Sequence, residues 1–581
     1  MEGRKKSMLQ AADYVVLGVV MLVSAGIGVY YRFTGGKQKT IEEYFSANRS
    51  MSVLPLSIAL MVSFVSAITV LGISGEIYAH GTLFAVHYIG IVAATVVVGY
   101  FYLPVFFELD SMSVYEYLER RFGIAARLTT SIANYIQLTL YTGVVLYAPS
   151  LAIEATTGLS SKTSITLIAV ICIFYSTVGG IKAVLVTDIF QGVLMFASLV
   201  CILAVASSEI DGGLGRVWQV ASQRGRLEFF DFRPDPTIRH TCWSLICGCF
   251  CLFCSLYGVN QVEVQRLKTV KTLRAARLAL FMNVPMLVSF GLMTCFCGLV
   301  LFVVYKDCDP VRSGQVGSAD RLMPHFAATK MAVYPGLAGL FISGIFSASL
   351  STISAMLNSL AAVFLEDYLK RLYRRAGRSF PAEKEAYFGK VLAVSNGLIC
   401  TSIAFLAGSL GSLITLTVSI TGSIAGPVLG IFTLGMFFEG ANEKGAVVGI
   451  VTALLTCMWA SFGQPRPKVP PLPASTDGCN FTVLPAGLSV AEPPRDPSSY
   501  FYLYRISYMW YSPMGATITL VVGYLASLLF DKFSRERPIE PDPSLFTPML
   551  AERIRRKRSD AAKTTSSQVL ALEEANARRN Q

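Results

Sequence analysis

Charged residues are scarce in this chain. Asp, Glu, Lys and Arg make up 15% of the 581 residues, whereas 53% are hydrophobic. A soluble protein of this length would carry far more charge, so the composition excludes a large soluble domain. Histidine is also rare, with four residues, and the apolar segments contain no histidine cluster, no paired acids and no nucleophile motif. The sequence therefore predicts a membrane protein that is not an enzyme.

Long apolar runs dominate the chain instead. The first run is not a signal peptide, because no small-residue cleavage site follows it and Tyr30-Tyr31-Arg32 is typical of a membrane interface. The predicted fold class is an all-α integral membrane protein with one transmembrane domain over residues 13–530. About thirteen runs are long enough to cross a bilayer as helices: 13–31, 52–77, 83–106, 126–148, 162–178, 183–206, 241–258, 278–305, 331–365, 387–407, 412–437, 445–461 and 512–530.

The distribution of basic residues predicts the orientation in the membrane. Basic connections at 266–277 and 370–378 would face the cytoplasm, whereas the connection near 148–161 has almost no basic residues and would face outward. The net charge of +12 then reflects topology and contact with anionic lipid, not nucleic-acid binding. Residues 4–6 are basic and disagree with this assignment. We predict a plasma-membrane protein with three exposed parts: an extracellular N-terminus (1–12), an extracellular loop (462–511) and a cytoplasmic tail (531–581).

The predicted outside loops contain a glycosylation sequon and two cysteines. Asn480-Phe-Thr482 predicts an N-glycan, which requires this loop to face outward. Cys308 and Cys479 both lie outside, where oxidation can join them. Most of the thirteen cysteines fall within spans. Four of them would spread around one apolar helix, which favours packing over metal binding: Cys247, Cys249, Cys251 and Cys254.

Two neighbouring hydroxyls in the ninth apolar run form a candidate cation site. Ala348, Ser351 and Thr352 have the spacing i, i+3, i+4, so a helix places them on one face within about one turn. Two hydroxyl oxygens and a nearby carbonyl are suitable ligands for a small cation. The alternative is that these small residues only pack helices together, as is common in membranes.

Asp188 is a lone carboxylate inside a span, which makes it a functional candidate. It needs a cationic partner: a sodium ion, a proton or Lys182. If Lys182 is the partner, Asp188 has a structural role only. Other ionisable residues are expected at span ends. Glu76 and His80 would lie at an outer mouth, and Glu263, beside Arg266, would be a solvated or paired charge at the membrane interface.

The second apolar run contains hydroxyls in mid-membrane. Ser63, Ser66 and Thr69 have the spacing i, i+3, i+6, and a continuous helix would use them for packing. A locally unwound helix would instead present carbonyls to an ion and helix ends to a ligand. No glycine or proline marks a break there, so both interpretations stay open.

Five separated motifs occur in order and together resemble the sodium/solute symporter family over about residues 10–530. The resemblance implies a core of two inverted repeats of five helices with broken first helices, and a sodium site between the second and ninth spans. The motifs are Tyr44–Met51, Ser111–Phe122, Tyr175–Gln191, Asn260–Arg266 and Ser351–Asp367.

The resemblance also implies site residues. Asp188 matches a family aspartate near the inner sodium path. Ser354 and Gln191 are candidates for a second cation or for the polar lining. The implied sodium ligands are the carbonyl oxygens of Val62, Val65 and Ala348 and the hydroxyls of Ser351 and Thr352.

The positions that hold a sugar in other family members offer few hydrogen-bonding groups here. They correspond to Phe64, Thr69, Tyr88 and Val418, which do not suit a sugar. Leu256–Gln261 and Ser63–Gly72 instead resemble the branch of iodide, monocarboxylate and multivitamin transporters. Glu263 departs from the small or amide residue expected in its motif. The predicted solute pocket consists of Phe64, Ser66, Thr69, Tyr257 and Val418.

Together these features predict a sodium-coupled symporter of small organic anions, either monocarboxylates or carboxylate vitamins such as biotin and pantothenate, working by alternating access. Sodium is the co-transported ion and the expected partners are the anion, sodium and the lipid bilayer. Two alternatives remain: an iodide-type inorganic anion symporter, or a sodium-gated sensor or channel that does not concentrate its ligand. Accumulation against a gradient separates a carrier from a channel.

Overall fold

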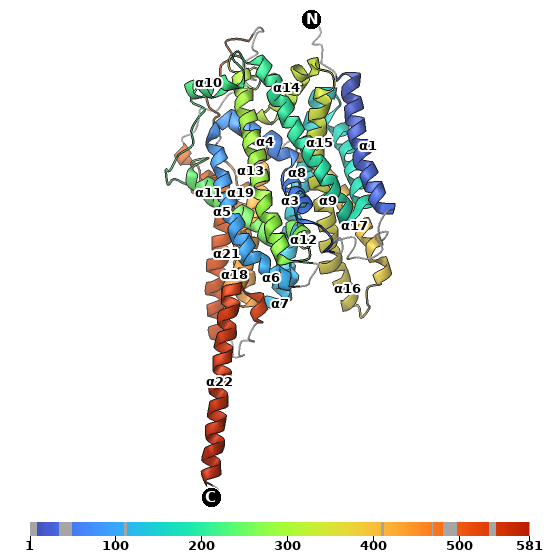
Figure 1. Ribbon diagram of the computed structural model, residues 1–581. Helices are drawn as coiled ribbons and strands as arrows, with labels where there is room; N and C mark the ends of the chain where they lie inside the picture. Colours follow the sequence, from blue (N-terminus) through green and yellow to red (C-terminus); the bar gives the residue numbers. More distant parts are fainter. Residues whose placement is uncertain are drawn as a thin grey trace.

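The computed structural model describes residues 9–33, 49–109, 113–407, 412–467, 469–479, 497–533 and 542–579. Over these residues the regular structure is helical, with no strand, and the helices form one bundle from which the last helix projects (Figure 1). The helices up to α11 are α1 (Ala11–Phe33), α3 (Val53–Phe64), α4 (Ala67–His80), α5 (His87–Val97), α6 (Leu103–Glu108), α7 (Glu116–Arg121), α8 (Ile124–Thr157), α9 (Ser161–Glu209), α10 (Val217–Gln223) and α11 (Cys242–Phe253). The others are α12 (Gln261–Leu267), α13 (Leu273–Val304), α14 (Leu322–Thr329), α15 (Leu337–Val363), α16 (Lys370–Arg375), α17 (Glu385–Ala407), α18 (Leu413–Phe437), α19 (Glu443–Phe462), α20 (Tyr502–Arg505), α21 (Tyr511–Phe533) and α22 (Pro548–Arg579).

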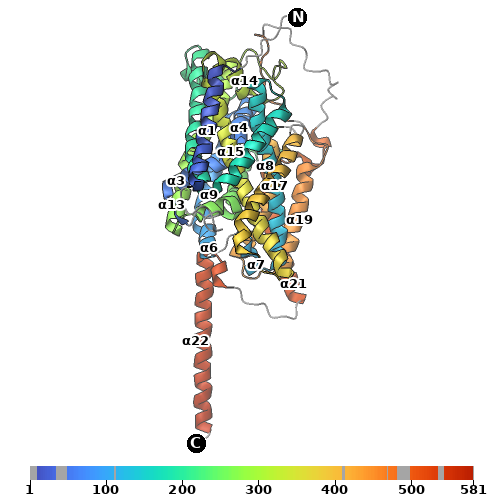
Figure 2. The same cartoon turned by 90° about the vertical axis from the view of Figure 1, so that its right-hand side faces the viewer.

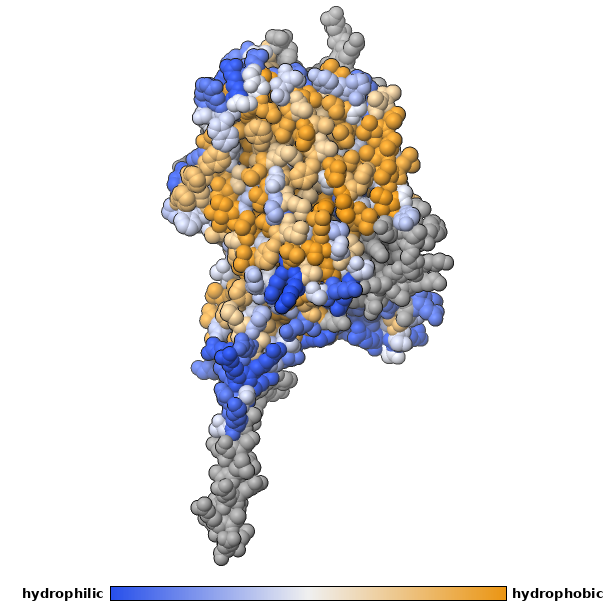
Figure 3. Space-filling model, in the orientation of Figure 1, coloured by the Kyte–Doolittle hydropathy of each residue, from blue (hydrophilic) through white to orange (hydrophobic). Residues whose placement is uncertain are grey.

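The surface of the bundle is suited to a lipid bilayer. Apolar side chains cover a broad band of the face shown in Figure 3, and hydrophilic side chains gather below it. Ten helices of the described residues are long and apolar enough to span a membrane, or up to eleven if one bent pair counts as a span. The all-helical fold is confirmed, but a count of thirteen is not.

One helix covers two of the predicted spans. Helix α9 runs from Ser161 to Glu209, through Gly179-Gly180, where we predicted a connection between 162–178 and 183–206. Glycine lowers helix propensity but retains its backbone N–H, so the helical hydrogen bonds can continue through such a pair.

The second predicted span is broken. Helices α3 and α4 meet at 58°, separated by Val65 and Ser66 in extended conformations. The Val65 N–H donates to Met61 O at 3.0 Å, which closes the last turn of α3. The Ser66 N–H donates to the Thr69 hydroxyl at 3.3 Å, which satisfies a backbone group that the break leaves free. Unwinding, one of the two interpretations that the sequence left open, is the one observed.

A second interruption separates α11 and its π-helical extension (Cys254–Val259) from α12. Asn260 has an extended backbone there, and its side-chain oxygen accepts a hydrogen bond from the Val262 N–H at 2.9 Å. Asparagine is well suited to this position because its short amide caps the first turn of the next helix.

Close helix packing positions the polar residues of the core. Helix α15 packs along α9 and also contacts α3 and α8. A Cβ atom on Gly192 would lie 2.8 Å from Val62 Cγ2, and one on Gly344 would lie 2.5 Å from Ser198 Cβ. These glycines therefore allow α9 to approach α3 and α15 closely, and this approach brings the polar face of α9 to the helix break.

The ends of the described chain lie at opposite ends of the bundle. Helix α1 begins at one end, and α22 extends from the other (Figures 1 and 2). At the end of the bundle where α1 begins, a disulfide joins Cys308 to Cys479. The sequence had left this pairing open. Asn480, the predicted glycosylation site, lies outside the described residues.

Candidate functional site: a helix break facing buried hydroxyls and a small cavity

The two hydroxyls of α15 meet the broken helix at its break. The Thr352 hydroxyl lies 3.1 Å from the carbonyl oxygen of Ser63, in the last turn of α3, and 3.0 Å from that of Ala348 in its own helix. The Ser351 hydroxyl donates to Asp188 on α9 at 2.5 Å. All of these side chains are buried. Oxygen atoms from α3, α9 and α15 therefore converge at one point inside the bundle.

Asp188 has a basic partner that the sequence did not indicate. Arg266, on α12, donates from one nitrogen to the Asp188 carboxylate at 2.7 Å and to the Ala59 carbonyl at 3.1 Å. Arg266 is 2% exposed, so it lies inside the bundle, where α12 contacts α3 and α15, and not in the cytoplasmic connection predicted for residues 266–277. The side chain of Lys182, the partner considered from the sequence, lies outside the described residues.

The two candidates for a second cation have different environments. Gln191 lies one turn after Asp188 on α9, fully buried, and neither its amide oxygen nor its nitrogen has a hydrogen-bond partner among the described residues. The Ser354 hydroxyl donates to the Ser351 carbonyl at 2.9 Å. Gln191 therefore has free polar atoms beside the Asp188 group, whereas Ser354 is satisfied within its helix.

A cavity of about 140 Å³ lies beside the break, with mainly apolar walls. Four of the five predicted solute residues line it, namely Phe64, Ser66, Thr69 and Val418. Tyr257 does not. Its ring stacks against Phe253 at a centroid distance of 4.2 Å, and its hydroxyl donates to Leu60 O at 3.1 Å. Tyr257 thus supports the wall from behind, because its position on the π-helical turn directs it toward α3.

The sequence interpretation missed one charged residue in this cavity. Glu263, expected at the interface, lines the cavity and is 5% exposed. The Ser63 hydroxyl lies 3.0 Å from one of its carboxylate oxygens. The signal was present in the sequence, because Glu263 is the residue that departs from the family motif, but only the fold brings α12 to the cavity.

A larger cavity, of about 630 Å³, lies beyond the C-terminal end of α4. Glu76 and His80 line it, together with Arg239, which donates to both Glu76 oxygens at 2.7 and 2.9 Å. Asp320 accepts a hydrogen bond from the Leu413 N–H at 3.0 Å. Burial raises the pKa of Asp320 to about 6, although this backbone hydrogen bond opposes the rise. This cavity has charged walls and lies toward the C-terminal end of α4, whereas the apolar cavity lies toward its N-terminal end.

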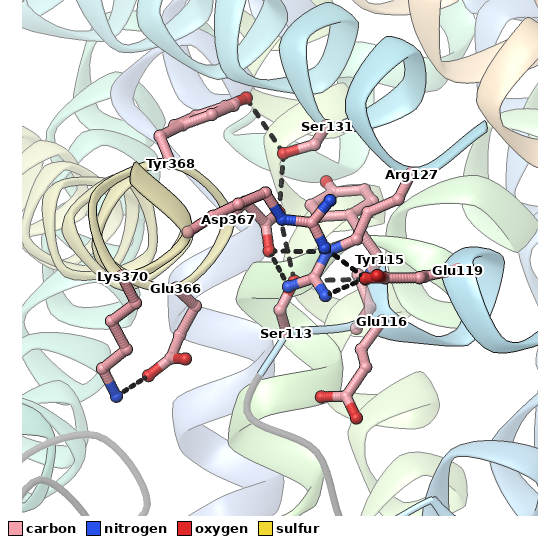
Figure 4. A network of polar contacts seen from close by, with 12 residues as sticks. Ser113, Tyr115, Glu116, Glu119, Arg127, Ser131, Glu366, Asp367, Tyr368 and Lys370 are labelled. Atoms are coloured by element: carbon pink, nitrogen blue, oxygen red, sulfur yellow. Dashed lines mark hydrogen bonds and ion pairs between the residues drawn. The ribbon is translucent and has the colours of Figure 1, made fainter. Parts of the chain in front are cut away.

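At the other end of the bundle, a polar network joins α7 and α8 to the π-helical turn (Phe364–Leu369) that continues α15 (Figure 4). Arg127 pairs with Asp367 and with Glu119, the latter at 2.6 Å. Ser131 donates to Asp367 at 2.7 Å, and Arg371 pairs with Glu119 at 2.5 Å. Ser113 also donates to Asp367 at 3.3 Å, so the network connects residues of two family motifs that lie 254 positions apart and ties the end of the α15 segment to α7 and α8.

Comparison with known proteins identifies the family. The family model of the sodium:solute symporter family matches residues 44–453. A Drosophila melanogaster protein named "Putative sodium-dependent multivitamin transporter" is 47% identical over 94% of this chain and 93% of its own length. The human sodium-coupled monocarboxylate transporter 1 is 36% identical over 89% of this chain and 87% of its own length.

Solved structures agree with these relatives. A sodium-coupled sialic acid symporter in a substrate-bound, outward-open state has a TM-score of 0.74 and 25% identity, covering 90% of this chain and 98% of its own. A nucleobase-cation-symport-1 family transporter, Mhp1, has a TM-score of 0.54 at 13% identity, which supports the fold. These proteins are transporters and not enzymes, and sodium coupling is shared by the family. The chain belongs to the sodium:solute symporter family.

Proposed function

We propose that this protein is a plasma-membrane symporter that uses the sodium gradient to carry small organic anions, either monocarboxylates or carboxylate vitamins, into the cell by alternating access. The observation that carries the proposal is the contact between the Thr352 hydroxyl and the Ser63 carbonyl, since it places the α15 hydroxyls at the break between α3 and α4. The sodium ligands would be the carbonyl oxygens of Val62, Val65 and Ala348 and the hydroxyls of Ser351 and Thr352.

Asp188 would belong to the sodium-binding residues as well, and its charge would stabilise the bound ion. Its carboxylate accepts the Ser351 hydrogen bond, which leaves the lone pairs of that hydroxyl available to a cation, and its charge is balanced by Arg266. Gln191, with its unpartnered amide, is the better candidate for a second cation, and Ser354 is the weaker one.

The apolar cavity supports an acid as the solute. A sugar would leave several hydroxyls unpaired among Phe64, Val418 and their apolar neighbours, each at a cost of about 1–3 kcal/mol. A monocarboxylate needs partners only at its charged end, and the hydroxyls of Ser66 and Thr69, the free helix ends and nearby sodium can provide them. The relatives named as monocarboxylate and multivitamin transporters support this solute class.

Binding of sodium and solute would be mutually reinforcing. Sodium at the break lowers the electrostatic cost of an anion in the cavity, so each ligand raises the affinity for the other by the same factor. The proposed orientation places the N-terminal end of α1 at the outer face, together with the Cys308–Cys479 disulfide and a glycan at Asn480, and the basic helix α22 in the cytoplasm.

An uptake panel in cells that express the protein tests the solute class. Labelled lactate, biotin, pantothenate, iodide and glucose are compared with sodium or choline as the external cation. We expect sodium-dependent uptake of at least one organic acid and none of glucose. Uptake of iodide alone would indicate an inorganic anion carrier, and glucose uptake without any response to acids would contradict the proposed solute class.

A further inference from the structure

A carboxyl group without a cationic partner lies in the wall of the small cavity. Glu263 is at the start of α12, directly after the Asn260 interruption, and is 5% exposed. One carboxylate oxygen lies 3.0 Å from the Ser63 hydroxyl. The other has no hydrogen-bond partner in the described part of the chain. A buried carboxylate oxygen without a donor is costly, so its position in a cavity wall indicates that a ligand completes it.

The neighbouring basic side chain, that of Arg266, already pairs with another carboxylate. Arg266 donates to Asp188 at 2.7 Å, and no basic group among the described residues lies within 4.0 Å of Glu263. One nitrogen of Arg266 also lacks a hydrogen-bond partner, but the guanidinium carries a single charge that Asp188 already offsets. With both carboxyl groups ionised, Glu263, Asp188 and Arg266 together would have one negative charge in excess.

The carboxylate of Glu263 is informative because a glutamine at this position would be neutral. Glutamine has nearly the shape of glutamate and would keep the hydrogen bond with Ser63, yet it would place no charge in the cavity. The chain instead carries a carboxylate beside a pocket proposed to hold an anion. An unneutralised carboxylate there would repel that anion, since the interaction is strong where water is excluded.

We propose that the Glu263 carboxylate binds one monovalent cation inside the solute cavity, in addition to the sodium ion at the helix break. The inference rests on the proposed solute cavity. Two sources share the required chemistry: a further sodium ion, or the ammonium group of a solute that carries both a carboxylate and an amine. In either case the loaded cavity holds one more positive charge than it would with an amide at this position.

Sodium binding to the purified full-length protein in lipid nanodiscs tests the first source. Radioactive sodium is titrated without solute onto wild type, Glu263→Gln and the control Glu154→Gln. The control removes a carboxylate of α8 that pairs with Arg321. If the source is sodium, Glu263→Gln binds one sodium ion fewer, or binds it at least about tenfold more weakly, whereas the control matches wild type.

Competition between two acids tests the second source. γ-Aminobutyrate and butyrate have similar carbon chains and differ in the ammonium group. If the source is the solute, sodium binding is unchanged, and the preference of wild type for γ-aminobutyrate over butyrate falls at least about tenfold in Glu263→Gln. Unchanged sodium binding together with an unchanged preference would overturn the proposal, because the carboxyl would then be permanently uncharged.

Two features keep the test decisive. If Glu263→Gln does not elute as a monodisperse protein, Glu263→Met replaces it, since an unbranched apolar side chain fits the cavity wall. Sodium binding is measured without transport. If wild type transports no organic acid, the proposed function fails, while the comparison of bound sodium still decides whether Glu263 is a cation site.

Discussion

At the scale of single residues, Ser351 and Thr352 are the most direct test of the sodium site. Replacing both with alanine removes two oxygens from a small coordination shell and leaves helix propensity intact. We expect the sodium concentration for half-maximal uptake to rise about tenfold or more, which corresponds to about 1.4 kcal/mol. The control Ser343→Ala removes a hydroxyl that bonds to Gly339 O within the same helix. Equal sodium dependence in the double mutant and the control would contradict the site.

The second residue-scale prediction concerns the Asp188–Arg266 pair. Asp188→Asn leaves a buried guanidinium unpaired, and breaking such a pair typically costs about 3–5 kcal/mol. We expect loss of sodium-coupled uptake and a lower thermal midpoint in a fluorescence size-exclusion assay. The double variant Asp188→Asn with Arg266→Met removes both charges. If it regains stability but not uptake, Asp188 acts in transport; if it regains both, the carboxylate is only a structural partner of Arg266.

At the scale of helices, the network at the end of α15 predicts a selective loss of stability. Asp367 is fully buried and binds Arg127 and Ser131. Asp367→Asn should therefore lower the thermal midpoint and the uptake rate, with a cost of about 3–5 kcal/mol. Arg120→Gln is the matched control, because Arg120 pairs with Glu116 on the exposed side of α7 and such pairs contribute about 0–1 kcal/mol. Equal effects of the two variants would show that the network has no special role.

The broken helix shows how far the sequence could predict this fold. Apolar length predicted most spans, and helical spacing placed Ser351 and Thr352 on one face, since both depend on local periodicity. The break at Val65 and Ser66 has no local signal, because neither residue disfavours a helix as proline does. It is explained by contacts that join α3 to α9, α12 and α15. Only the family resemblance implied it beforehand.

The errors have the same origin. Glu263 was expected at an interface and Arg266 in a cytoplasmic connection, because both follow an apolar run and are charged. Their burial depends on pairing with Asp188 and Ser63, which lie 78 and 200 positions away along the chain. Such partners are fixed by tertiary packing and not by sequence spacing. Tyr257 was misplaced similarly, because a π-helical turn rotates its side chain away from the cavity.

At the scale of the whole molecule, the disulfide links distant parts of the chain. Cys308 follows α13 and Cys479 lies in the loop after α19, 171 positions later. A cross-link over so long a loop typically contributes about 2–5 kcal/mol. We expect Cys308→Ser to lower the thermal midpoint by about 5 °C or more, with sodium affinity unchanged, because the disulfide is remote from the helix break. Cys201→Ser, which removes a free thiol, is the control and should match wild type.

The central claim is that the molecule couples the sodium gradient to movement of an organic acid. Purified full-length protein in proteoliposomes tests it most directly, with sodium outside, choline inside and labelled biotin or lactate as solute. We predict a transient internal concentration above the external one, which disappears when an ionophore dissipates the sodium gradient and is absent in the Ser351→Ala, Thr352→Ala double variant. Uptake of these acids that only reaches the external concentration, with or without the sodium gradient, would contradict the account.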